Sequence, residues 1–295
     1  MEKVLEVNNL SKNYGGLEAV RNVSFSVNRG EVYGLLGPNG SGKTTTLAVI
    51  LGVLNANGGD FKWFGNTLQK EARQKIGSLI ETPNFYPYLT LFENLLIAAK
   101  IKNASEESIN YALGVANLLK RKHTNFGTLS LGMKQRMAIA SVLIGDPEVL
   151  VLDEPTNGLD PEGFAEVRSI IQSQAAKGKT IILASHILDE VEKVCSHVAI
   201  LKSGDLIANG RVGELLTTED LVFIQSTNQD ELFSALQMAE MVSRVTKVED
   251  DLSVVLKKPF SASELNKFCF EKGFVLSKIM LRKQSLEAQF LELVK

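Results

Sequence analysis

The sequence predicts an α/β fold in which a mainly parallel sheet carries a phosphate-binding loop, followed by a small α+β unit. A short apolar run over 32–36 breaks into a glycine-rich loop, and an apolar-periodic helix then begins at Lys43. Two further apolar runs, 148–154 and 179–185, end in polar side chains, as central parallel strands do where they border a site. The tail from residue 217 alternates strand-like and helix-like segments.

The glycine-rich loop has the residue types that phosphate binding needs. Glycines let backbone N–H groups turn toward phosphate oxygens, and the helix N-terminus adds the positive end of its dipole. We expect Lys43 to reach the β- and γ-phosphates and the Thr44 hydroxyl to ligate Mg²⁺. A glycine-rich turn without function is the alternative, and the strand before it and the helix after it argue against this. The expected nucleotide-binding residues are Gly37, Pro38, Asn39, Gly40, Ser41, Gly42, Lys43, Thr44 and Thr45.

Length and charge narrow the class of protein. A chain of 295 residues is long enough for one large domain and a smaller appendage. The net charge of −2 gives no basic field that would favour nucleic acid or an anionic membrane surface. No uncharged apolar stretch reaches membrane-spanning length, and acidic residues stand where a signal peptide needs an apolar core. Cys195 and Cys269 have no Cys or His partner at metal-ligand spacing, so we expect two buried thiols.

A strand and an aromatic residue precede the phosphate-binding loop. Alternating residues predict a strand over 4–7, and turn-forming residues predict a loop over 11–16. Tyr14 in that loop has no local apolar neighbour, and a flat ring there can stack on a nucleobase, an interaction worth about 1–3 kcal/mol per base. Packing on a sheet edge is the alternative. Trp63, in a predicted strand over 59–64, is interpreted as structural.

An irregular aromatic segment and three helical patterns occupy the middle of the chain. Glu81 ends a predicted strand, and the segment 82–89 combines two prolines with three aromatic residues, which indicates a contact site for a partner. Capping-box spacing predicts a helix from Thr90 to about 102. A second helical pattern covers 105–119, and a third helix is expected directly after Ser130.

Two carboxylates end the apolar run over 148–154. Asp153 can hold Mg²⁺ as the acidic partner of a phosphate loop. We assign Glu154 to the attacking water as general base, a role worth about 10² to 10⁴ in rate. Adjacent residues of an extended strand point to opposite sides, so both carboxylates serve one site only if the chain bends there. After the carboxylates, we expect Asp160 to be the N-cap and Pro161 the first residue of the next helix. The other apolar run, 179–185, is followed by His186.

Together these motifs resemble the ATP-binding subunit of ABC (ATP-binding cassette) transporters over about 4–216. The resemblance implies ATP and Mg²⁺ as ligands, and ATP hydrolysis coupled to transport. It implies a P-loop NTPase core with a mainly parallel sheet, an antiparallel β subdomain and a helical insert over about 84–146. It also implies residue roles: Tyr14 would stack on adenine, Asp153 would bind the metal, Glu154 would be catalytic and His186 would sense the γ-phosphate. Asp160 would belong to the family's loop that follows the two carboxylates.

Two positions depart from the usual residues of this family. Leu-Ser-Leu-Gly-Met over 129–133 stands where the family usually has Leu-Ser-Gly-Gly-Gln. Ser130 and Gly132, which in the family bind the γ-phosphate held by the opposite subunit, are retained. Glu81 stands where the family usually has a glutamine that touches Mg²⁺, which makes Glu81 a candidate metal contact and catalytic residue. A Glu at this position, followed by Asn-Phe-Tyr-Pro over 84–87, is similar to the ATPase subunits of bacitracin and lantibiotic immunity exporters.

The tail, 217–295, carries none of these motifs. Its patterns follow the order βαββαβ, which resembles a ferredoxin-like unit. An amphipathic helix is expected over 285–294, and the tail is similar to that of drug-exporter ATPases with an accessory C-terminal domain. A dimer-stabilising appendage is favoured over a ligand-sensing role. The predicted strands and helices are 221–225, 230–239, 242–248, 252–256, 263–272 and 274–281.

These features favour a motor ATPase that drives export by a separate multi-helix membrane permease, with antimicrobial peptides or drugs as candidate substrates. The working unit is expected to contain a second cassette, as a homodimer, and to lie in the cytoplasm, on the inner face of the membrane through the permease. No nucleic acid partner is expected.

A soluble ABC ATPase acting on ribosomes or nucleic acid is the alternative. Such proteins resemble tandem cassettes or cassettes split by long coiled coils, and the sequence has neither a second phosphate loop nor sustained heptads. A P-loop GTPase is a weaker alternative, because the sole Asn-Lys pair, Asn266-Lys267, is followed by Phe268 and Cys269 instead of the Asn-Lys-x-Asp pattern for guanine.

Overall fold

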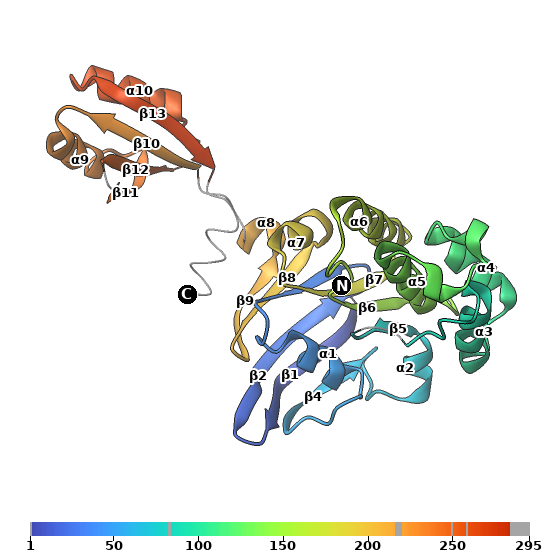
Figure 1. The fold of residues 1–295 in the computed structure, drawn as a ribbon. Coiled ribbons are helices and arrows are strands. Elements are labelled where there is room, and N and C mark those ends of the chain that lie inside the picture. Colours follow the sequence, from blue (N-terminus) through green and yellow to red (C-terminus); the bar gives the residue numbers. More distant parts are fainter. Residues whose placement is uncertain (1, 82–83, 216–219, 249, 258, 284–295) are drawn as a thin grey trace. The chain divides into compact units, whose positions relative to one another are not determined.

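The computed structural model describes residues 2–81, 84–215, 220–248, 250–257 and 259–283 (Figure 1). Backbone contacts divide the chain into two units, Met1–Leu215 and Leu216–Lys295. Within the described ranges, no helix is both long enough and apolar enough to cross a bilayer.

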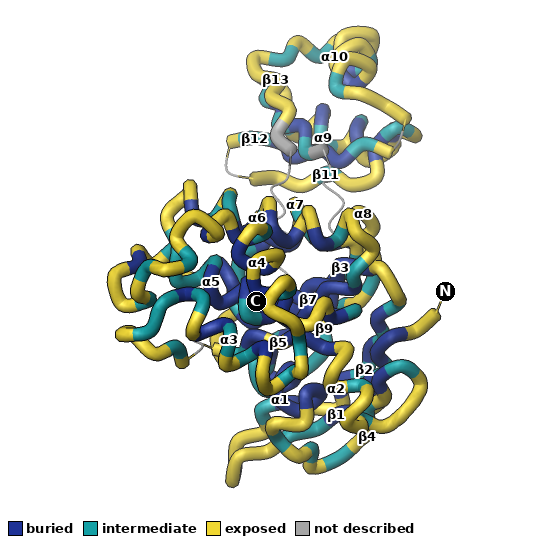
Figure 2. Tube along the Cα trace, turned by 90° about the vertical axis from the view of Figure 1, so that its right-hand side faces the viewer, coloured by how far each residue is buried: buried dark blue, intermediate teal, exposed yellow. Residues whose placement is uncertain are grey.

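The large unit is built on a six-stranded sheet in the order β5-β6-β7-β3-β8-β9. The first five of these strands are mutually parallel, and β9 joins β8 as an antiparallel hairpin. Strands β3, β6 and β7 are buried along their whole length, as Figure 2 shows for β3 and β7, which explains their continuous apolar runs. The strands are β3 (Val32–Leu36), β5 (Ile76–Leu79), β6 (Val149–Asp153), β7 (Thr180–Ser185), β8 (His197–Lys202) and β9 (Asp205–Arg211).

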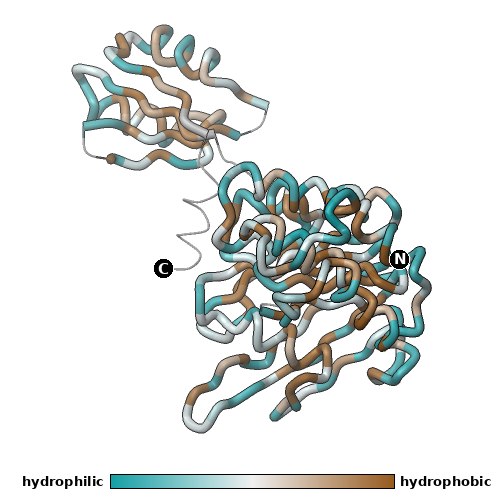
Figure 3. Tube along the Cα trace, turned by 45° about the vertical axis from the view of Figure 1, so that its right-hand side comes forward, coloured by the Kyte–Doolittle hydropathy of each residue, from teal (hydrophilic) through white to brown (hydrophobic). Residues whose placement is uncertain are grey.

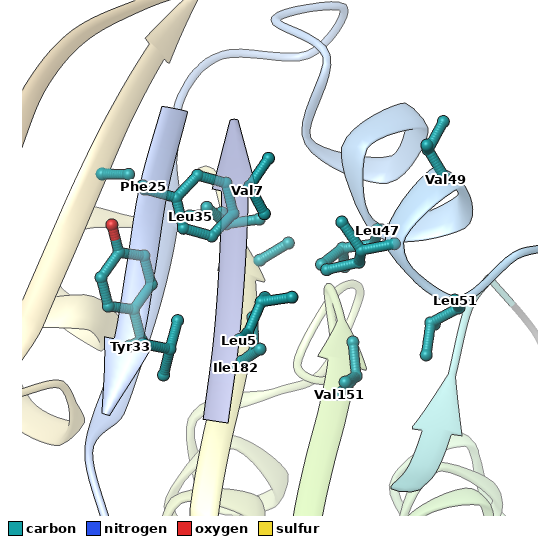
Figure 4. Close-up of a cluster of buried hydrophobic side chains, with 14 of the residues drawn as sticks. Leu5, Val7, Phe25, Tyr33, Leu35, Leu47, Val49, Leu51, Val151 and Ile182 are labelled. Carbon is teal, nitrogen blue, oxygen red and sulfur yellow. The ribbon is translucent and has the colours of Figure 1, made fainter. Parts of the chain in front are cut away.

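A three-stranded antiparallel sheet, β2-β1-β4, shares its core with the six-stranded sheet. Its strands are β1 (Lys3–Tyr14), β2 (Leu17–Asn28) and β4 (Gly58–Trp63). Figure 4 shows Leu5 and Phe25 of this sheet near Leu35 and Leu47 of β3 and α1 (Lys43–Ile50). The predicted structural role of Trp63 is confirmed, because its ring is fully buried and its Nε1 donates a 2.7 Å hydrogen bond to the Ile50 carbonyl.

The loop predicted over 11–16 is wrong for most of its length. Residues Ser11–Tyr14 continue β1 and pair with β2, with Lys12 opposite Val20 and Tyr14 opposite Leu17, so that only Gly15 and Gly16 form the turn. The segment is polar on both faces and therefore has the composition of a loop. Antiparallel pairing across the two-glycine turn satisfies its backbone groups and makes it strand.

The helical insert contains α3 (Leu91–Lys102), α4 (Glu106–Val115) and α5 (Leu131–Leu143), which lie near the β5 edge of the sheet (Figure 1). The predicted capping box is confirmed, because the Thr90 hydroxyl accepts from the Glu93 N–H and the Glu93 carboxylate accepts from the Thr90 N–H. The second helix is shorter than the predicted 105–119. Asn117 has a left-handed φ of 55°, which stops an α-helix, and Leu119–Arg121 forms a separate 3₁₀ turn.

The remaining helices of the large unit cover the sheet. Asp160 is the N-cap of α6 and Pro161 its first residue, as predicted, and Asp160 Oδ1 accepts a 2.9 Å hydrogen bond from the Gly163 N–H. These helices are α2 (Lys70–Gln74), α6 (Pro161–Ala176), α7 (Leu188–Val194) and α8 (Val212–Leu215); Phe126–Thr128 forms a second 3₁₀ turn. Figure 3 shows apolar residues following the strands in the middle of this unit.

The small unit is a four-stranded antiparallel sheet in the order β11-β12-β10-β13, with two helices on its core face. This order and the βαββαβ chain order together form a split βαβ arrangement, so the predicted small α+β fold is confirmed. The helix predicted over 285–294 lies outside the described residues. The elements are β10 (Asp220–Ser226), α9 (Gln229–Gln237), β11 (Val242–Val248), β12 (Asp251–Leu256), α10 (Ala262–Glu271) and β13 (Leu276–Lys283).

Both cysteines are buried free thiols, as predicted. Burial raises the pKa of Cys195, and it raises the pKa of Cys269 to about 11. Neither thiol is therefore ionised at neutral pH.

Candidate nucleotide-binding and hydrolysis site

The loop between β3 and α1 is a backbone cradle that only glycine permits at two positions. A Cβ atom on Gly37 would lie 2.3 Å from the Leu201 carbonyl oxygen, and one on Gly42 would lie 2.5 Å from the Ala19 carbonyl oxygen. Gly42 also has a φ of 101° and is the N-cap of α1, which has no side-chain cap. The first N–H groups of α1 are therefore left for an anion.

Two side chains in this loop fit a bound phosphate. Lys43 is 5% exposed, and its Nζ donates to the carbonyls of Gly37 (2.8 Å) and Pro38 (3.2 Å). The Ser41 hydroxyl is buried and has no hydrogen-bond partner among the described residues. A buried cation beside an unsatisfied hydroxyl, at a helix N-terminus, matches the charge and hydrogen-bonding demand of phosphate oxygens.

The chain bends directly after β6 and brings two adjacent carboxylates into one site. Glu154 has a φ of 47°, and its N–H donates to the Ala184 carbonyl of β7. Asp153 ends β6, and its Oδ1 is buried with no hydrogen-bond partner among the described residues. Both carboxylates line one cavity of about 600 Å³ together with Thr44. The chain therefore has the bend that both carboxylates need in order to serve one site.

The environment of Asp153 suits a metal ion. Burial raises the pKa of this carboxyl, the Thr44 hydroxyl opposes that shift, and the charges of Glu154 and Glu81 add to it. A buried carboxylate with an unused oxygen, next to a threonine hydroxyl, is an oxygen donor set that Mg²⁺ accepts together with phosphates. The residues present therefore fit the implied Mg²⁺ ion.

Glu154 is the centre of a charged contact that the sequence did not define. His186 Nδ1 lies 2.8 Å from Glu154 Oε2, and Lys43 Nζ lies 3.3 Å from Glu154 Oε1. The three residues follow β7, β3 and β6, which are neighbours in the sheet. Since parallel strands end at the same edge, residues 43, 154 and 186 meet although they are far apart in the chain.

Tyr14 lies at the end of β1, on the border of the phosphate loop. The residue is 47% exposed, and Lys12 Nζ lies 5.5 Å from the ring centroid. It lines a cavity of about 460 Å³ that also includes Lys43 and Thr44, with Asn39, Gly40, Gly42 and Thr45 among the other lining residues. An exposed ring beside the phosphate cradle is available to stack on a base.

Glu81 follows β5 at the same edge of the sheet. It is exposed, has a left-handed φ of 56°, and lines the 600 Å³ cavity with Thr44 and Asp153. Asn84 and Phe85 of the aromatic segment line this cavity as well. The structure thus brings Glu81 to the predicted metal residues.

Ser130 and Gly132 lie elsewhere on the large unit. Ser130 caps α5 by accepting a hydrogen bond from the Met133 N–H, which confirms the predicted helix start. Both residues line a separate cavity of about 420 Å³ with Gly158 and Asp160, and neither lines the two cavities that Thr44 lines. Within one chain, the structure does not bring them to the phosphate loop.

One residue near the site was missed by the sequence reasoning. Glu190, on α7, is buried and accepts hydrogen bonds from the hydroxyls of Thr156 and Ser185. A glutamate on the apolar face of α7, beside Leu188 and Val191, is the signal that would have found it.

Known proteins resemble this chain in both sequence and structure. The pattern described as "ABC transporter" matches residues 20–157. The bacitracin transport ATP-binding protein BcrA of Bacillus licheniformis is 35% identical over 100% of this chain and 98% of its own length. The lantibiotic transport ATP-binding protein SrtF of Streptococcus pyogenes is 40% identical over 69% of this chain and 89% of its own length.

Solved structures agree with the sequence relatives. The ADP conformation of MJ1267, an ATP-binding cassette of an ABC transporter, has a TM-score of 0.66 and 29% identity over 72% of this chain and 93% of that one. CbiO1 from Clostridium perfringens, part of the ABC transporter complex cbiONQ, has a TM-score of 0.67 and 28% identity over 81% of this chain and 96% of that one. This chain therefore belongs to the ATP-binding proteins of the ABC transporter family, which hydrolyse ATP to power transport.

Proposed function

We propose that this protein is the motor subunit of an ABC exporter and that Glu154 is the general base for ATP hydrolysis. The observation that carries the proposal is the contact of Glu154 with both Lys43, in the phosphate loop, and His186, at the end of β7. A carboxylate beside the phosphate cradle can accept a proton from an attacking water. We assign His186, whose Nδ1 lies 2.8 Å from Glu154 Oε2, to orienting the base and contacting the γ-phosphate.

The remaining residues of the site bind and orient the nucleotide. The backbone of the phosphate loop and Lys43 hold the phosphates, and Tyr14 stacks on the adenine. Thr44 and Asp153 would hold Mg²⁺, with Glu81 as a further direct or water-mediated ligand. When bound, Mg²⁺ neutralises charge on the β- and γ-phosphates.

The proposed working unit contains two cassettes, because Ser130 and Gly132 would complete the phosphate site of a second chain. Gly132 supports this role: it needs no left-handed φ, and a Cβ there would meet only the Gly163 Cα, at 3.8 Å. Its own chain therefore gives no packing reason for glycine. A γ-phosphate approaching the N-terminus of α5 from another chain would give one.

Light scattering of Glu154→Gln protein with ATP and Mg²⁺ tests this two-cassette unit. We expect a dimer with ATP and a monomer without it. Adding Gly132→Asp should abolish the dimer without unfolding the chain, because an acidic residue suits the first turn of α5 but repels phosphate. Gly132→Asn at the same position is the matched uncharged control. A monomer at all reachable concentrations of Glu154→Gln protein would refute the homodimer.

We further propose a separate membrane permease as partner, with an antimicrobial peptide or drug as the exported substrate. The similarity to BcrA over the full chain and to SrtF supports this substrate class. Tyr86 and Tyr88 are exposed and follow Asn84 and Phe85, which line the cavity with Glu81, so these two rings suit a contact with the partner. The partner would hold the protein at the inner face of the membrane.

Affinity purification of this protein from membranes of cells that also express the reading frames next to its gene tests this partner. Copurification of a multi-helix membrane protein is the expected result. Recovery of ribosomes or nucleic acid in its place would favour the soluble ABC ATPase.

A further inference from the structure

A buried carboxyl group lies behind the Glu154–His186 pair. Glu190, in the first turn of α7, is only 3% exposed. Its Oε1 accepts a hydrogen bond from the Thr156 hydroxyl and its Oε2 accepts one from the Ser185 hydroxyl. Thr156 and Ser185 are themselves buried. Both oxygens of this buried carboxyl group thus have a hydrogen-bond donor, one from the loop after β6 and one from the end of β7.

The two residues that hold Glu190 are next to the hydrolytic pair in the chain. Thr156 follows Glu154 by two residues, and Ser185 directly precedes His186. The carboxyl group of Glu190 therefore ties the loop after β6 to the end of β7, which are the two segments that carry Glu154 and His186.

Ser185 also connects the hydrogen-bonded group of Glu190, Thr156 and Ser185 to the phosphate loop. The Gly37 N–H donates a 3.3 Å hydrogen bond to the Ser185 carbonyl. The Ser185 hydroxyl, which donates to Glu190, accepts a 3.0 Å hydrogen bond from the Ile187 N–H on the far side of His186. Hydrogen bonds to the Ser185 carbonyl and hydroxyl thus hold the backbone on both sides of His186. The Ser185 hydroxyl is itself oriented by its hydrogen bond to Glu190.

We propose that Glu190 is a positioning residue for ATP hydrolysis, which sets the distance and orientation between Glu154 and His186 by holding Thr156 and Ser185. The inference rests on the proposed roles of Glu154 and His186. Glu190 does not line either of the two cavities that Thr44 lines, so it acts through its two hydroxyl partners and not on the nucleotide. A role in stability alone is the competing explanation, because α7 packs on β3 and β7.

Glu190→Gln is the decisive variant because it keeps the size of the side chain and removes one of the two acceptor oxygens. One hydroxyl then loses its acceptor, and the segment that carries it can shift. Small displacements of catalytic groups have large effects on rate, so we expect single-turnover ATP hydrolysis to slow by about tenfold or more. ATP affinity should stay within about threefold, because the phosphate loop is unchanged. Glu192→Gln, an exposed carboxylate on the same helix, is the matched control and should leave the rate unchanged.

A double-mutant cycle with His186→Ala separates positioning from stability. If Glu190 acts by orienting His186 against Glu154, its replacement should slow hydrolysis by less than about twofold once His186 is absent. A tenfold loss that persists in His186→Ala protein would overturn the proposal, as would a rate within twofold of wild type in folded Glu190→Gln protein. The single-turnover format, with protein in excess of ATP, keeps slow variants measurable.

The partner Thr156 keeps the proposal testable if Glu190→Gln fails to fold. Thr156→Val removes the hydroxyl at constant shape and should slow hydrolysis, whereas Thr156→Ser keeps the hydroxyl and should not. Equal rates in these two variants would overturn the proposal.

Normal hydrolysis by Glu154→Gln would remove the assigned base and this inference together. Loss of hydrolysis in Glu154→Gln with no change in Glu190→Gln or Thr156→Val would remove the inference alone.

Discussion

Replacing Glu154 by Gln should strengthen ATP binding and slow ATP hydrolysis. The carboxylate holds Lys43 at 3.3 Å and His186 at 2.8 Å, and its charge also repels a phosphate placed in the adjacent loop. Glutamine keeps the shape of the side chain but has no charge and cannot take a proton from water. Binding should therefore improve while turnover falls.

The distances set the size of both effects. Opposite charges 3.3 Å apart attract by about 5 kcal/mol at an effective dielectric constant of about 20. Desolvation of the Lys43–Glu154 pair offsets most of this attraction. We therefore expect the free energy of ATP binding to become more favourable by about 1.4 kcal/mol when Lys43 is free to contact the phosphates. That gain makes the Kd for ATP about tenfold lower. Loss of the general base should slow hydrolysis by about 10² or more.

Two assays measure these effects on the same protein. Competition with a fluorescent nucleotide gives the Kd, and phosphate release under single-turnover conditions gives the rate. Glu192→Gln serves as the control for loss of one negative charge on the surface. Lys43→Ala removes the ammonium group that contacts the phosphates and should bind ATP poorly. Weaker ATP binding by Glu154→Gln would contradict the competition between Glu154 and phosphate for Lys43. Hydrolysis within about threefold of wild type would move the base elsewhere, with His186 as the first candidate.

Three further predictions concern other parts of the molecule. Glu81→Gln should raise the Mg²⁺ concentration for half-maximal ATPase activity and keep the maximal rate within about tenfold, because a hard cation prefers a carboxylate over an amide oxygen; an unchanged or lower half-saturation point in a Mg²⁺ titration would exclude the metal contact. Thr90→Ala removes one half of the capping box of α3 and should lower the free energy of unfolding by about 1 kcal/mol in urea titrations, and no measurable loss would show that this helix start is stabilised by packing alone. Cys269, whose pKa burial raises to about 11, should react with a thiol reagent at pH 8 only after denaturant is added; rapid labelling of the native protein would show that the small unit opens.

Much of the fold and site could be predicted from the sequence, because the signals are local. The phosphate loop is defined by glycines next to an apolar strand and a helix start, so its residues are specified within a dozen positions. The helix starts at Thr90, Ser130 and Asp160 were predicted because a cap depends on side chains three residues apart. The βαββαβ order of the small unit follows in the same way from the period of its apolar residues.

Tertiary structure alone decided how the site is assembled. The left-handed bend at Glu154 turns two adjacent carboxylates into one cavity, and the parallel arrangement of β3, β6 and β7 brings Lys43 and His186 to the same carboxylate. Glycine is required at Gly42 by its φ of 101° and also by the close approach of the Ala19 carbonyl of β2. The contacts of Glu190 are with hydroxyls of the loop after β6 and of the end of β7. These contacts join residues that lie far apart in the chain, such as Lys43 and Glu154. Sequence patterns report only neighbours within a few residues, so packing of the sheet was needed to reveal them.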